Sequence, residues 1–370
     1  MLESKNKLII FSYDFPPSNG GIARLCNEIA NGMVANYSEI IIVTRKKEGP
    51  QQTYHNNAYT IIELPTQRLK CEWQAYTFLK CIANKQDYHL LCGVWHPEAT
   101  ISRLAGFKNI NVLTHGAELL HGGQIFRKYF WLPMYAKWIL NKTNIIANSA
   151  YTAKLSQKIA PKARITGLPL AVNHIFFKPK KDKKNKKIVI GTVSRVLQFK
   201  GHDFVLNVLN KLPIAYKNKL EWQIAGTGPY LKTLKNNVQR FGLQELVKFK
   251  GFLPDEILSD FYAGLDVFIL ATRENPKSSN IEGFGLVFLE AQACGVPVIG
   301  TNIGGIPSAI AHENGGWLIA QDNEQELTAL LKNLIDNPKI LQEQGLKARL
   351  RVEEECTWDL YCEQLFKILK

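Results

Sequence analysis

The sequence predicts an α/β protein with two doubly wound domains, each built on a parallel sheet. Strand-like apolar runs alternate with amphipathic segments, and this rhythm stops at a lysine-rich stretch, 178–187, before it starts again. The length supports the same division, because 370 residues exceed the size at which a single core usually splits. We therefore expect an N-terminal domain over 1–172 and a C-terminal domain over 173–352.

The N-terminal domain contains six runs that predict strands. Several of them are apolar almost throughout, which is typical of strands buried on both faces of a parallel sheet. The six runs lie at 7–13, 39–45, 59–64, 88–95, 109–115 and 143–149.

The same pattern returns in the C-terminal domain. Strands are predicted at 186–194, 220–226, 246–251, 265–271 and 295–301, with helices near 201–211, 229–241, 254–264, 286–294 and 306–312. The last segment predicts a terminal amphipathic helix over 353–370, because its apolar residues recur at helical spacing: Trp358, Tyr361, Leu365, Phe366 and Leu369.

Composition narrows the class of protein. A chain that is 46% hydrophobic and 21% charged is ordinary for a soluble globular protein. It contains no stretch of about twenty apolar residues that would span a bilayer, and its N-terminus does not resemble a signal peptide. Seven cysteines, an odd number without a C-x-x-C pair, indicate reduced thiols. A cytoplasmic location is expected.

The formal charge of +14 is unevenly distributed. Residues 1–172 hold 20 basic and 10 acidic side chains, and residues 178–187 hold seven and one. Such an imbalance suggests an anionic partner, for example a membrane face, a phospholipid or a phosphorylated glycan. No nucleic acid partner is predicted, and the alternative is that the lysines only keep the protein soluble.

Ligands of open α/β sheets bind outside the carboxyl ends of the strands, so the loops there are the first candidates for a site. Gly20 and Gly21 follow the first strand and precede a helix expected near Ile22, whose amides suit an anion or a sugar hydroxyl. His115 ends another strand and could contact a sugar ring. A tight turn and a structural histidine are the respective alternatives.

Three loops of the C-terminal domain carry similar signals. Arg195 and Lys200 follow a predicted strand and could hold a diphosphate, although each could also be a surface charge. The next strand ends in Gly226, Thr227 and Gly228, whose flexibility permits close approach of a ligand, and Pro229 looks like the first residue of a helix. This is not the dinucleotide fingerprint, because Leu231 stands at the third glycine position.

The stretch "IEGFGLVFLEAQACGVPVIG" places Glu282 in a loop and Glu290 inside a predicted helix that ends near Gly295. A carboxylate in so apolar a helix requires hydrogen bonds, which sugar or ribose hydroxyls could supply. An ion pair in the core is the alternative for Glu290. Between the two carboxylates, a helix N-terminus favours phosphate; this segment comprises Gly283, Phe284, Gly285, Leu286 and Val287.

Taken together, these stretches resemble the retaining glycosyltransferases of family 4, which have the GT-B fold. The resemblance rests on "PPSNGG", "THGAE", "SRVLQFKG", "AGTGP", "FKGFLPDEILSDFYAGLDVFIL" and the Glu, seven residues, Glu pattern of 282–290 followed by "ACGVPVIGTNIGGIPSAI". The pieces occur in the family's order and cover nearly the whole chain.

The resemblance implies two facing Rossmann-like domains with a nucleotide-sugar in the cleft and the terminal helix packed on the N-terminal domain. It implies that Glu282 binds donor sugar hydroxyls, Glu290 the ribose, and Arg195 with Lys200 the diphosphate. Gly21 would line the donor phosphate, and His115 would contact the sugar near its reacting carbon. Gly251 and Phe252 would flank the base.

The expected activity is retaining transfer of a hexosyl unit, mannosyl or glucosyl, to a glycan or lipid-linked acceptor in polysaccharide or lipopolysaccharide synthesis. The chain contains no Asp-x-Asp pair, so no metal or cofactor is expected, and fixed cations and helix amides would neutralise the leaving diphosphate. The acceptor would lie at the cytoplasmic membrane surface. The alternatives are a sugar-nucleotide 2-epimerase, a non-catalytic sugar-nucleotide-binding subunit and, less well supported, an NAD oxidoreductase.

Overall fold

The structure, a computed structural model, describes residues 7–18, 20–47, 53–55, 58–180, 186–275 and 280–370. It divides into a first unit, residues 1–168 and 358–370, and a second unit, residues 169–357. The boundaries expected from the sequence were 172 and 352. They lie at 168 and 357 because Val172 pairs with the chain at Cys356 and Thr357 inside the second unit. Residues 181–185 of the lysine-rich stretch lie outside the described residues.

The first unit is built on an eight-stranded sheet of order β3-β4-β2-β1-β5-β6-β7-β8. Its strands are β1 Lys7–Phe11, β2 Ile40–Arg45, β3 Thr53–His55, β4 Thr60–Leu64, β5 Tyr88–Cys92, β6 Ile110–Thr114, β7 Asn144–Ala147 and β8 Arg164–Gly167. All neighbours pair in parallel except β3 and β4. The six predicted strands are confirmed. Sequence patterns missed β3 and β8, which are short edge strands without an apolar run.

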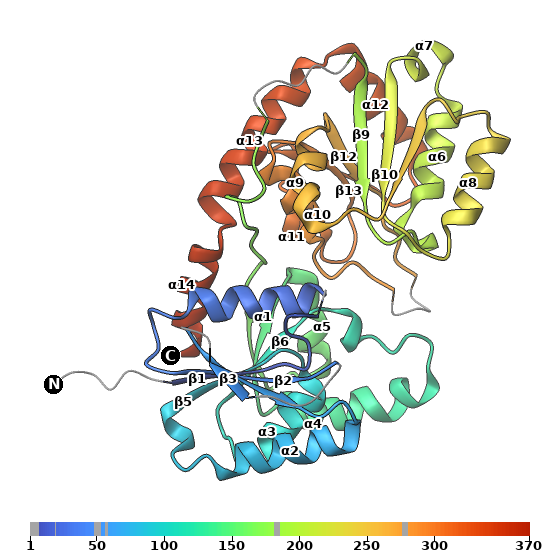
Figure 1. The fold of residues 1–370 in the computed structure, drawn as a ribbon. Coiled ribbons are helices and arrows are strands. Elements are labelled where there is room, and N and C mark those ends of the chain that lie inside the picture. Colours follow the sequence, from blue (N-terminus) through green and yellow to red (C-terminus); the bar gives the residue numbers. More distant parts are fainter. Residues whose placement is uncertain (1–6, 19, 48–52, 56–57, 181–185, 276–279) are drawn as a thin grey trace. The chain divides into compact units, whose positions relative to one another are not determined.

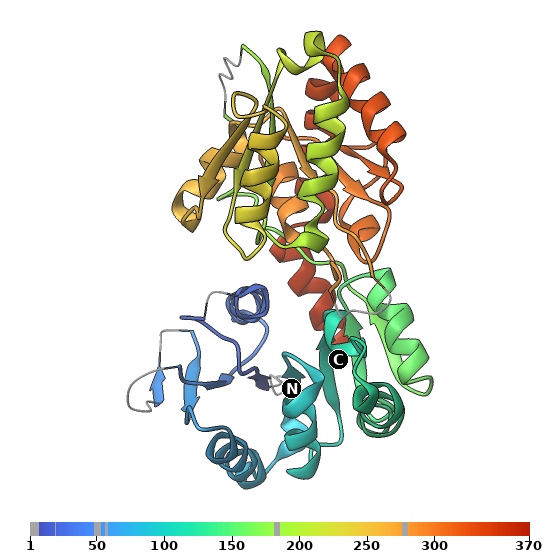
Figure 2. The same ribbon diagram turned by 90° about the vertical axis from the view of Figure 1, so that its right-hand side faces the viewer.

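The helices of the first unit cover both faces of this sheet. They are α1 Gly21–Gly32, α2 Arg68–Cys81, α3 Thr100–Leu104, α4 Lys137–Leu140, α5 Ala150–Ile159 and α14 Trp358–Leu369, with shorter or wider turns at η1 Lys85–Asp87, η2 Trp95–Ala99, η3 Ala117–Leu119 and η4 Arg127–Ala136. Figure 1 shows α1 on one face and α2, α3 and α4 on the other. In Figure 2, α1 and α2 are seen nearly end-on, on opposite sides of the strands.

The terminal helix differs from the sequence prediction. A continuous helix over 353–370 was expected, but α13 ends at Glu355 and α14 begins at Trp358. The break lies where Cys356 and Thr357 pair with Val172 instead of continuing the helix. The predicted apolar face is confirmed, because Tyr361, Leu365 and Leu369 are buried. α14 packs against α1, and a Cβ on Gly32 of α1 would lie 2.5 Å from Sγ of Cys362.

The second unit is built on a six-stranded sheet of order β11-β10-β9-β12-β13-β14, and every pair is parallel. Its strands are β9 Ile188–Val193, β10 Leu220–Ala225, β11 Val247–Gly251, β12 Val267–Leu270, β13 Val298–Thr301 and β14 Gly316–Ile319. The five predicted strands are confirmed. Because side chains from both faces of this sheet are buried, its strands read as nearly continuous apolar runs.

Helices lie on both faces of the second sheet as well. They are α6 His202–Lys211, α7 Ile214–Lys217, α8 Leu231–Arg240, α9 Asp255–Ala263, α10 Leu286–Ala293, α11 Ile306–Ala309, α12 Glu324–Asp336 and α13 Lys339–Glu355, with a short turn η5 Gln198–Lys200. α6 contacts α8 and α12 on one face, and α10 contacts α9, α11 and α13 on the other. The five predicted helices are confirmed.

One helix start was predicted wrongly. Pro229 was expected to open a helix, but α8 begins at Leu231 and Pro229 lies in the preceding turn. The amide of Val196 donates to the carbonyl of Thr227, and the amide of Tyr230 donates to the carbonyl of Val196. These two bonds hold the turn against the neighbouring loop, and the helix begins only after them.

Candidate active site

The candidate residues of the second unit share one edge of its sheet. Arg195 and Lys200 follow β9, Gly226 to Gly228 follow β10, Gly251 ends β11, and Glu282 lies in the long connection between β12 and α10. In a parallel sheet the carboxyl ends of all strands meet at one edge, so the fold gathers these loops there. The sequence predicts Arg195, Lys200, Gly226 and Gly228 after strand ends, but one strand at a time.

Lys200 and Glu282 form a direct ion pair at this edge. The Nζ atom of Lys200 lies 2.6 Å from Oε2 of Glu282. Their side chains are only 15% and 17% exposed, so water screens the pair less than a surface salt bridge. Lys200, expected to bind the diphosphate, and Glu282, expected to bind the sugar, are therefore ion-paired with each other in this structure.

The loop of Glu282 is fixed by the turn after β13. The carbonyl of Glu282 accepts a hydrogen bond from the amide of Gly305 at 2.9 Å. A Cβ on Gly305 would lie 1.8 Å from the carbonyl oxygen of Gly283, which leaves room for glycine alone. α10 then begins at Leu286, directly after this clamped loop, with no side-chain cap on its first amides. Gly285 immediately precedes the helix, Val287 lies in its first turn, and Phe284 is buried beside it.

Glu290, the second carboxylate of the motif, is the fifth residue of α10 and only 7% exposed. Its Oε2 accepts a hydrogen bond of 2.8 Å from the hydroxyl of Tyr262, a fully buried residue of α9. This partner was not foreseen, because nothing in the spacing of residues 262 and 290 signals it. The ribose contact expected of Glu290 stays a prediction.

Two residues at this edge expose groups that suit a ligand. The side chain of Arg195 lies in the β9 loop without an ion-pair partner among the described residues. Phe252, directly after β11, is 73% exposed, which is unusual for a large apolar ring. A cation and an aromatic ring are the groups that a diphosphate and a base require.

The glycines after β10 lie very close to the backbone of the loop that follows β9. A Cβ on Gly226 would lie 1.9 Å from the carbonyl oxygen of Ser194, and one on Gly228 would lie 2.4 Å from that of Val196. Because both residues lack a side chain, the backbone of the β10 loop can pack directly against the backbone of the β9 loop. The exposed Thr227 lies between them, and the ligand contact predicted for all three stays a prediction.

Arg273 links the β9 loop to its surroundings, a role that the sequence pattern did not predict. Its Nη1 donates to both oxygens of Asp203 at 2.8 Å, its Nε donates to Asp322 at 2.5 Å, and its amide donates to the carbonyl of Phe199 at 2.6 Å. Lys200 is the next residue after Phe199, so this hydrogen bond links Arg273 to the segment that carries Lys200. Arg273 follows β12, and the strand-end rule that selected Arg195 also points to it.

The candidate residues of the first unit also lie at the carboxyl edge of their sheet. α1 begins at Gly21, within one residue of the prediction, and a Cβ on Gly20 or Gly21 would meet nothing within 4 Å. His115 follows β6, where its Nε2 donates to the carbonyl of Gly93 at 2.8 Å and its amide donates to Glu118 at 2.7 Å. The ring is therefore held by the loop after β5, and Nε2 carries the proton.

A buried acid was missed in the same loop region. Glu98 of η2 is 1% exposed, and its Oε1 accepts a hydrogen bond from the amide of Tyr13 at 3.2 Å. Its other oxygen has no partner among the described residues. Burial raises the pKa of Glu98 to about 8, because the charged form loses its hydration. It therefore binds a proton near neutral pH and ties the β1 loop to the β5 loop.

Comparisons with known proteins agree with this arrangement. Residues 174–351, nearly all of the second unit, match the family model "Glycosyl transferases group 1". The chain is 25% identical, over 98% of both sequences, to a GDP-mannose-dependent alpha-(1-6)-phosphatidylinositol monomannoside mannosyltransferase of Mycolicibacterium smegmatis. It is 26% identical to the amylovoran biosynthesis glycosyltransferase AmsK of Erwinia amylovora, over 68% of this chain and 63% of that one. The crystal structure of Anabaena HepE in complex with UDP and glucose superposes with a TM-score of 0.75 over 98% of each chain, at 17% identity.

The protein is a glycosyltransferase with the GT-B fold, similar to the enzymes of family 4. The expected fold of two Rossmann-like parallel-sheet domains is thereby confirmed, as is the resemblance inferred from the motifs.

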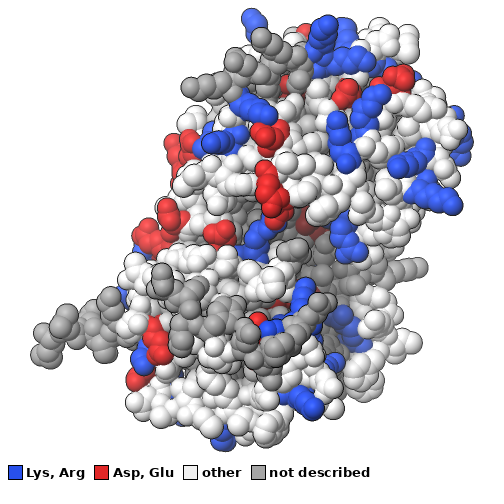
Figure 3. Space-filling model, viewed as in Figure 1, with Lys and Arg blue, Asp and Glu red and all other residues white. Residues whose placement is uncertain are grey.

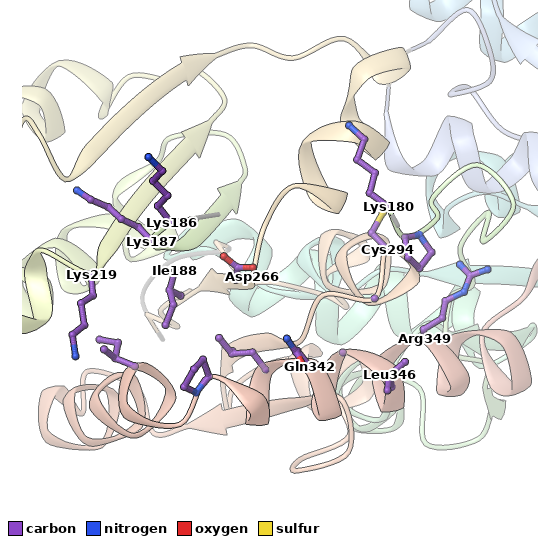
Figure 4. Close-up of a pocket in the computed structure, with 16 residues that line it drawn as sticks. Lys180, Lys186, Lys187, Ile188, Lys219, Asp266, Cys294, Gln342, Leu346 and Arg349 are labelled. Carbon is purple, nitrogen blue, oxygen red and sulfur yellow. The ribbon is translucent and has the colours of Figure 1, made fainter. Parts of the chain in front are cut away.

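The glycosyltransferase also has a cavity of about 800 Å³ away from these loops. It is lined by Ile188, the first residue of β9, and by Lys219 and Asp266, which directly precede β10 and β12, so it lies at the amino edge of the second sheet. Figure 4 shows Lys186, Lys187 and Lys219 at one end. None of the candidate donor residues lines this cavity, so its size does not mark the active site.

The surface charge of the glycosyltransferase is locally uneven in the second unit too. Figure 3 shows Lys and Arg side chains over α8, where Lys232, Lys235 and Arg240 are exposed. The net charge of residues 173–370 outside the lysine-rich stretch is close to neutral, and composition did not reveal this cluster. In the described parts of the chain, no helix is both long and apolar enough to cross a membrane.

Proposed function

We propose that this glycosyltransferase moves a hexosyl unit, mannosyl or glucosyl, from a nucleotide-diphospho-sugar to a glycan or lipid-linked acceptor, with retention of anomeric configuration and without a metal ion. The acceptor belongs to cell-surface polysaccharide or lipopolysaccharide synthesis. GDP-mannose is the first donor to test, because the relative that aligns over nearly the full chain is GDP-mannose dependent. UDP-hexoses remain the second candidates.

The ion pair between Lys200 and Glu282 carries the proposal. A donor diphosphate brings negative charge to Lys200, so it competes with the Glu282 carboxylate for the ammonium group. Once displaced, Glu282 accepts hydrogen bonds from hydroxyls of the donor sugar. In the free enzyme the two side chains thus satisfy each other. When the donor binds, Lys200 turns to the diphosphate and Glu282 to the sugar.

The transfer step is proposed to take place on one face of the sugar. The bond between the anomeric carbon and the phosphate oxygen breaks while the acceptor oxygen bonds to that carbon from the same side, and the acceptor proton passes to the leaving phosphate oxygen. Lys200, Arg195 and the first amides of α10 stabilise the charge that develops on the diphosphate. Such fixed donors supply the stabilisation that a bound cation would otherwise give.

The acceptor is proposed to lie at an anionic membrane surface, to which the protein binds peripherally. Residues 1–172 carry an excess of ten basic side chains, and each lysine or arginine near an anionic leaflet contributes attraction.

The test is a screen of nucleotide-sugars with and without a lipid-extract acceptor. We expect GDP-mannose to give acceptor-dependent release of GDP and a labelled lipid product with the α-configuration of the donor. Release of nucleotide from the donor alone, with no need for an acceptor, would instead indicate the 2-epimerase. Strong donor binding without any transfer would indicate a non-catalytic subunit.

A further inference from the structure

The segment 125–138 of the first unit carries an exposed apolar strip. Its members are each 48% to 74% exposed and comprise Ile125, Phe126, Tyr129, Phe130, Met134 and Trp138. We call these six residues the aromatic strip. Four of them recur at every fourth position, from Phe126, which directly precedes η4, through η4 to Trp138 in α4. Large apolar residues scattered singly are normal on a surface, but a contiguous set of this size marks an interaction site.

The opposite side of the same segment is firmly packed. Leu132, Ala136, Ile139 and Leu140 are buried and belong to the apolar core of the first unit. The segment therefore cannot turn the aromatic strip inward without emptying this core. The exposure of the strip is fixed by the fold.

The rings of the strip are ordered among themselves and against lysines. Phe126 and Phe130 stack with their centroids 6.1 Å apart. Nζ of Lys128 lies 5.1 Å from the ring centroid of Tyr129, and Nζ of Lys142 lies 5.0 Å from that of Trp138. Aromatic rings flanked by lysine heads form a surface that is apolar at its centre and positive at its rim.

The chain segment that contains the strip carries charge of one sign. Residues 119–172 contain eight Lys or Arg side chains and no Asp or Glu. Lys128, Lys137 and Lys142 are exposed within or beside the strip. This segment supplies most of the basic excess of the first unit, and no acidic side chain of its own weakens its attraction for anions.

These features favour a lipid surface over a protein partner. Lysines are depleted at protein interfaces, where their heads would lose water. At a membrane surface they stay hydrated and face anionic headgroups, while Trp, Tyr and Phe rings enter the interfacial layer. The strip offers both kinds of group side by side.

We propose that the aromatic strip is the membrane-docking surface of this protein, with its rings inserted between headgroups of an anionic leaflet and Lys128, Lys137 and Lys142 on the phosphates. The inference rests on the proposed function, because it assigns the surface through which the enzyme reaches a lipid-linked acceptor. It concerns the first unit alone and involves none of the donor-site residues.

The test is vesicle flotation of the full-length protein with phosphatidylcholine vesicles that contain either no phosphatidylglycerol or about 30% of it. We expect binding to the anionic vesicles that weakens at high salt, and little binding to the neutral ones. The double variant Phe126→Ser/Phe130→Ser should lower the affinity at least tenfold. The triple variant Lys128→Gln/Lys137→Gln/Lys142→Gln should lose the salt dependence.

The matched control is Leu69→Ser/Trp73→Ser, which removes two apolar side chains of α2 that are 80% and 65% exposed. It should bind vesicles as the parent does. Circular dichroism and thermal unfolding of every variant check that the protein is folded, and GDP titration tests the donor site separately. Vesicle binding that is unchanged in the Phe126/Phe130 variant, or absent in the parent, overturns the proposal. So does a dimer of the parent that the same variant abolishes while neither protein binds vesicles.

The experiments distinguish failure of the membrane-docking proposal from failure of the proposed activity. If no nucleotide-sugar is used but the strip variants lose vesicle binding, the proposed activity fails and the docking surface stands. If transfer occurs on a lipid acceptor and the strip variants keep vesicle binding, the activity stands and the docking surface fails.

Discussion

Nζ of Lys200 lies 2.6 Å from Oε2 of Glu282, although 82 residues separate them in the chain. Both side chains are mostly buried, so removing one residue would leave the other as a poorly hydrated charge without a partner. The pair links the loop after β9 to the loop before α10. A ligand that binds either residue therefore changes the environment of the other.

The first prediction concerns this pair. Glu282→Gln should lower kcat by about 100-fold or more, because the donor sugar loses the carboxylate that accepts its hydroxyl hydrogen bonds. The same change should leave GDP affinity unchanged or raise it, since Lys200 no longer has a competing partner. Lys200→Met should weaken GDP binding by about tenfold, as expected for loss of a charged hydrogen bond.

Calorimetric titration of GDP and initial rates with GDP-mannose check these outcomes. Lys180→Met, which breaks the exposed pair with Asp260, is the control and should change neither quantity. Equal loss of turnover and GDP affinity in Glu282→Gln would indicate a structural role for Glu282. Unchanged GDP affinity in both Arg195→Ala and Lys200→Met would remove the diphosphate assignment.

The second prediction concerns Gly21, the first residue of α1. Gly21→Ala should keep or slightly raise stability, because alanine is the better helix former and its Cβ would meet no atom within 4 Å. If the donor phosphate approaches this backbone, affinity for GDP-mannose should fall several-fold. Gly167→Ala, at another open position, is the control. Thermal unfolding and donor titration together decide, and unaltered donor affinity would argue against the phosphate contact.

The third prediction concerns Arg273. Arg273→Gln leaves Asp203 and Asp322 without their cation, which should destabilise the fold by about 1–3 kcal/mol. GDP affinity should fall as well, because the loop that carries Lys200 loses its support. Arg273→Lys should restore stability only in part, since lysine lacks the guanidinium fork.

Urea unfolding and GDP titration measure both effects. The exposed Arg240→Gln on α8 serves as the control. A destabilised Arg273→Gln protein that binds GDP with full affinity would show that Arg273 supports the fold without positioning Lys200.

The fourth prediction concerns pH and Glu98. Its pKa is raised to about 8 in the folded protein, whereas an unfolded glutamate titrates near 4.3. The native state therefore loses stability as the pH rises between these two values, because ionisation is easier in the unfolded chain. Glu98→Gln removes that loss, and its glutamine oxygen can still accept from the amide of Tyr13.

The free energy of unfolding of Glu98→Gln relative to the parent should thus increase from pH 5 to pH 8, by at most about 1.4 kcal/mol per pH unit. Below pH 4, where Glu98 is protonated in both the folded and the unfolded state, its ionisation should add little to the difference in free energy of unfolding. Denaturant unfolding at several pH values measures the difference. The exposed Glu343→Gln should give a flat profile, and a flat profile for Glu98→Gln would contradict the buried, protonated state.

The fifth prediction concerns metal dependence. If fixed cations and the amides of α10 stabilise the leaving diphosphate, transfer from GDP-mannose should persist in excess EDTA, and added Mg²⁺ should change kcat by less than about twofold. Initial rates in both conditions provide the check. Loss of activity in EDTA that returns with Mg²⁺ would refute the metal-independent mechanism.

The sequence by itself determined the order and type of most elements. The runs that became β1, β9 and β12 are apolar almost throughout, and burial on both faces of a parallel sheet requires that composition. Because strand ends could be located, so could the loops that carry Arg195, Lys200 and Glu282. These are local properties, readable from short windows of residues.

Only the tertiary structure decided which side chains meet. The partners of Glu282 and Glu290, which are Lys200 and Tyr262, lie on other elements, and no spacing along the chain specifies such pairs. The same holds for Arg273 with Asp203, for the buried state of Glu98 and for the exposure of Phe126 and Phe130. Each depends on how helices cover a sheet, because contact and burial follow from packing between segments distant in sequence.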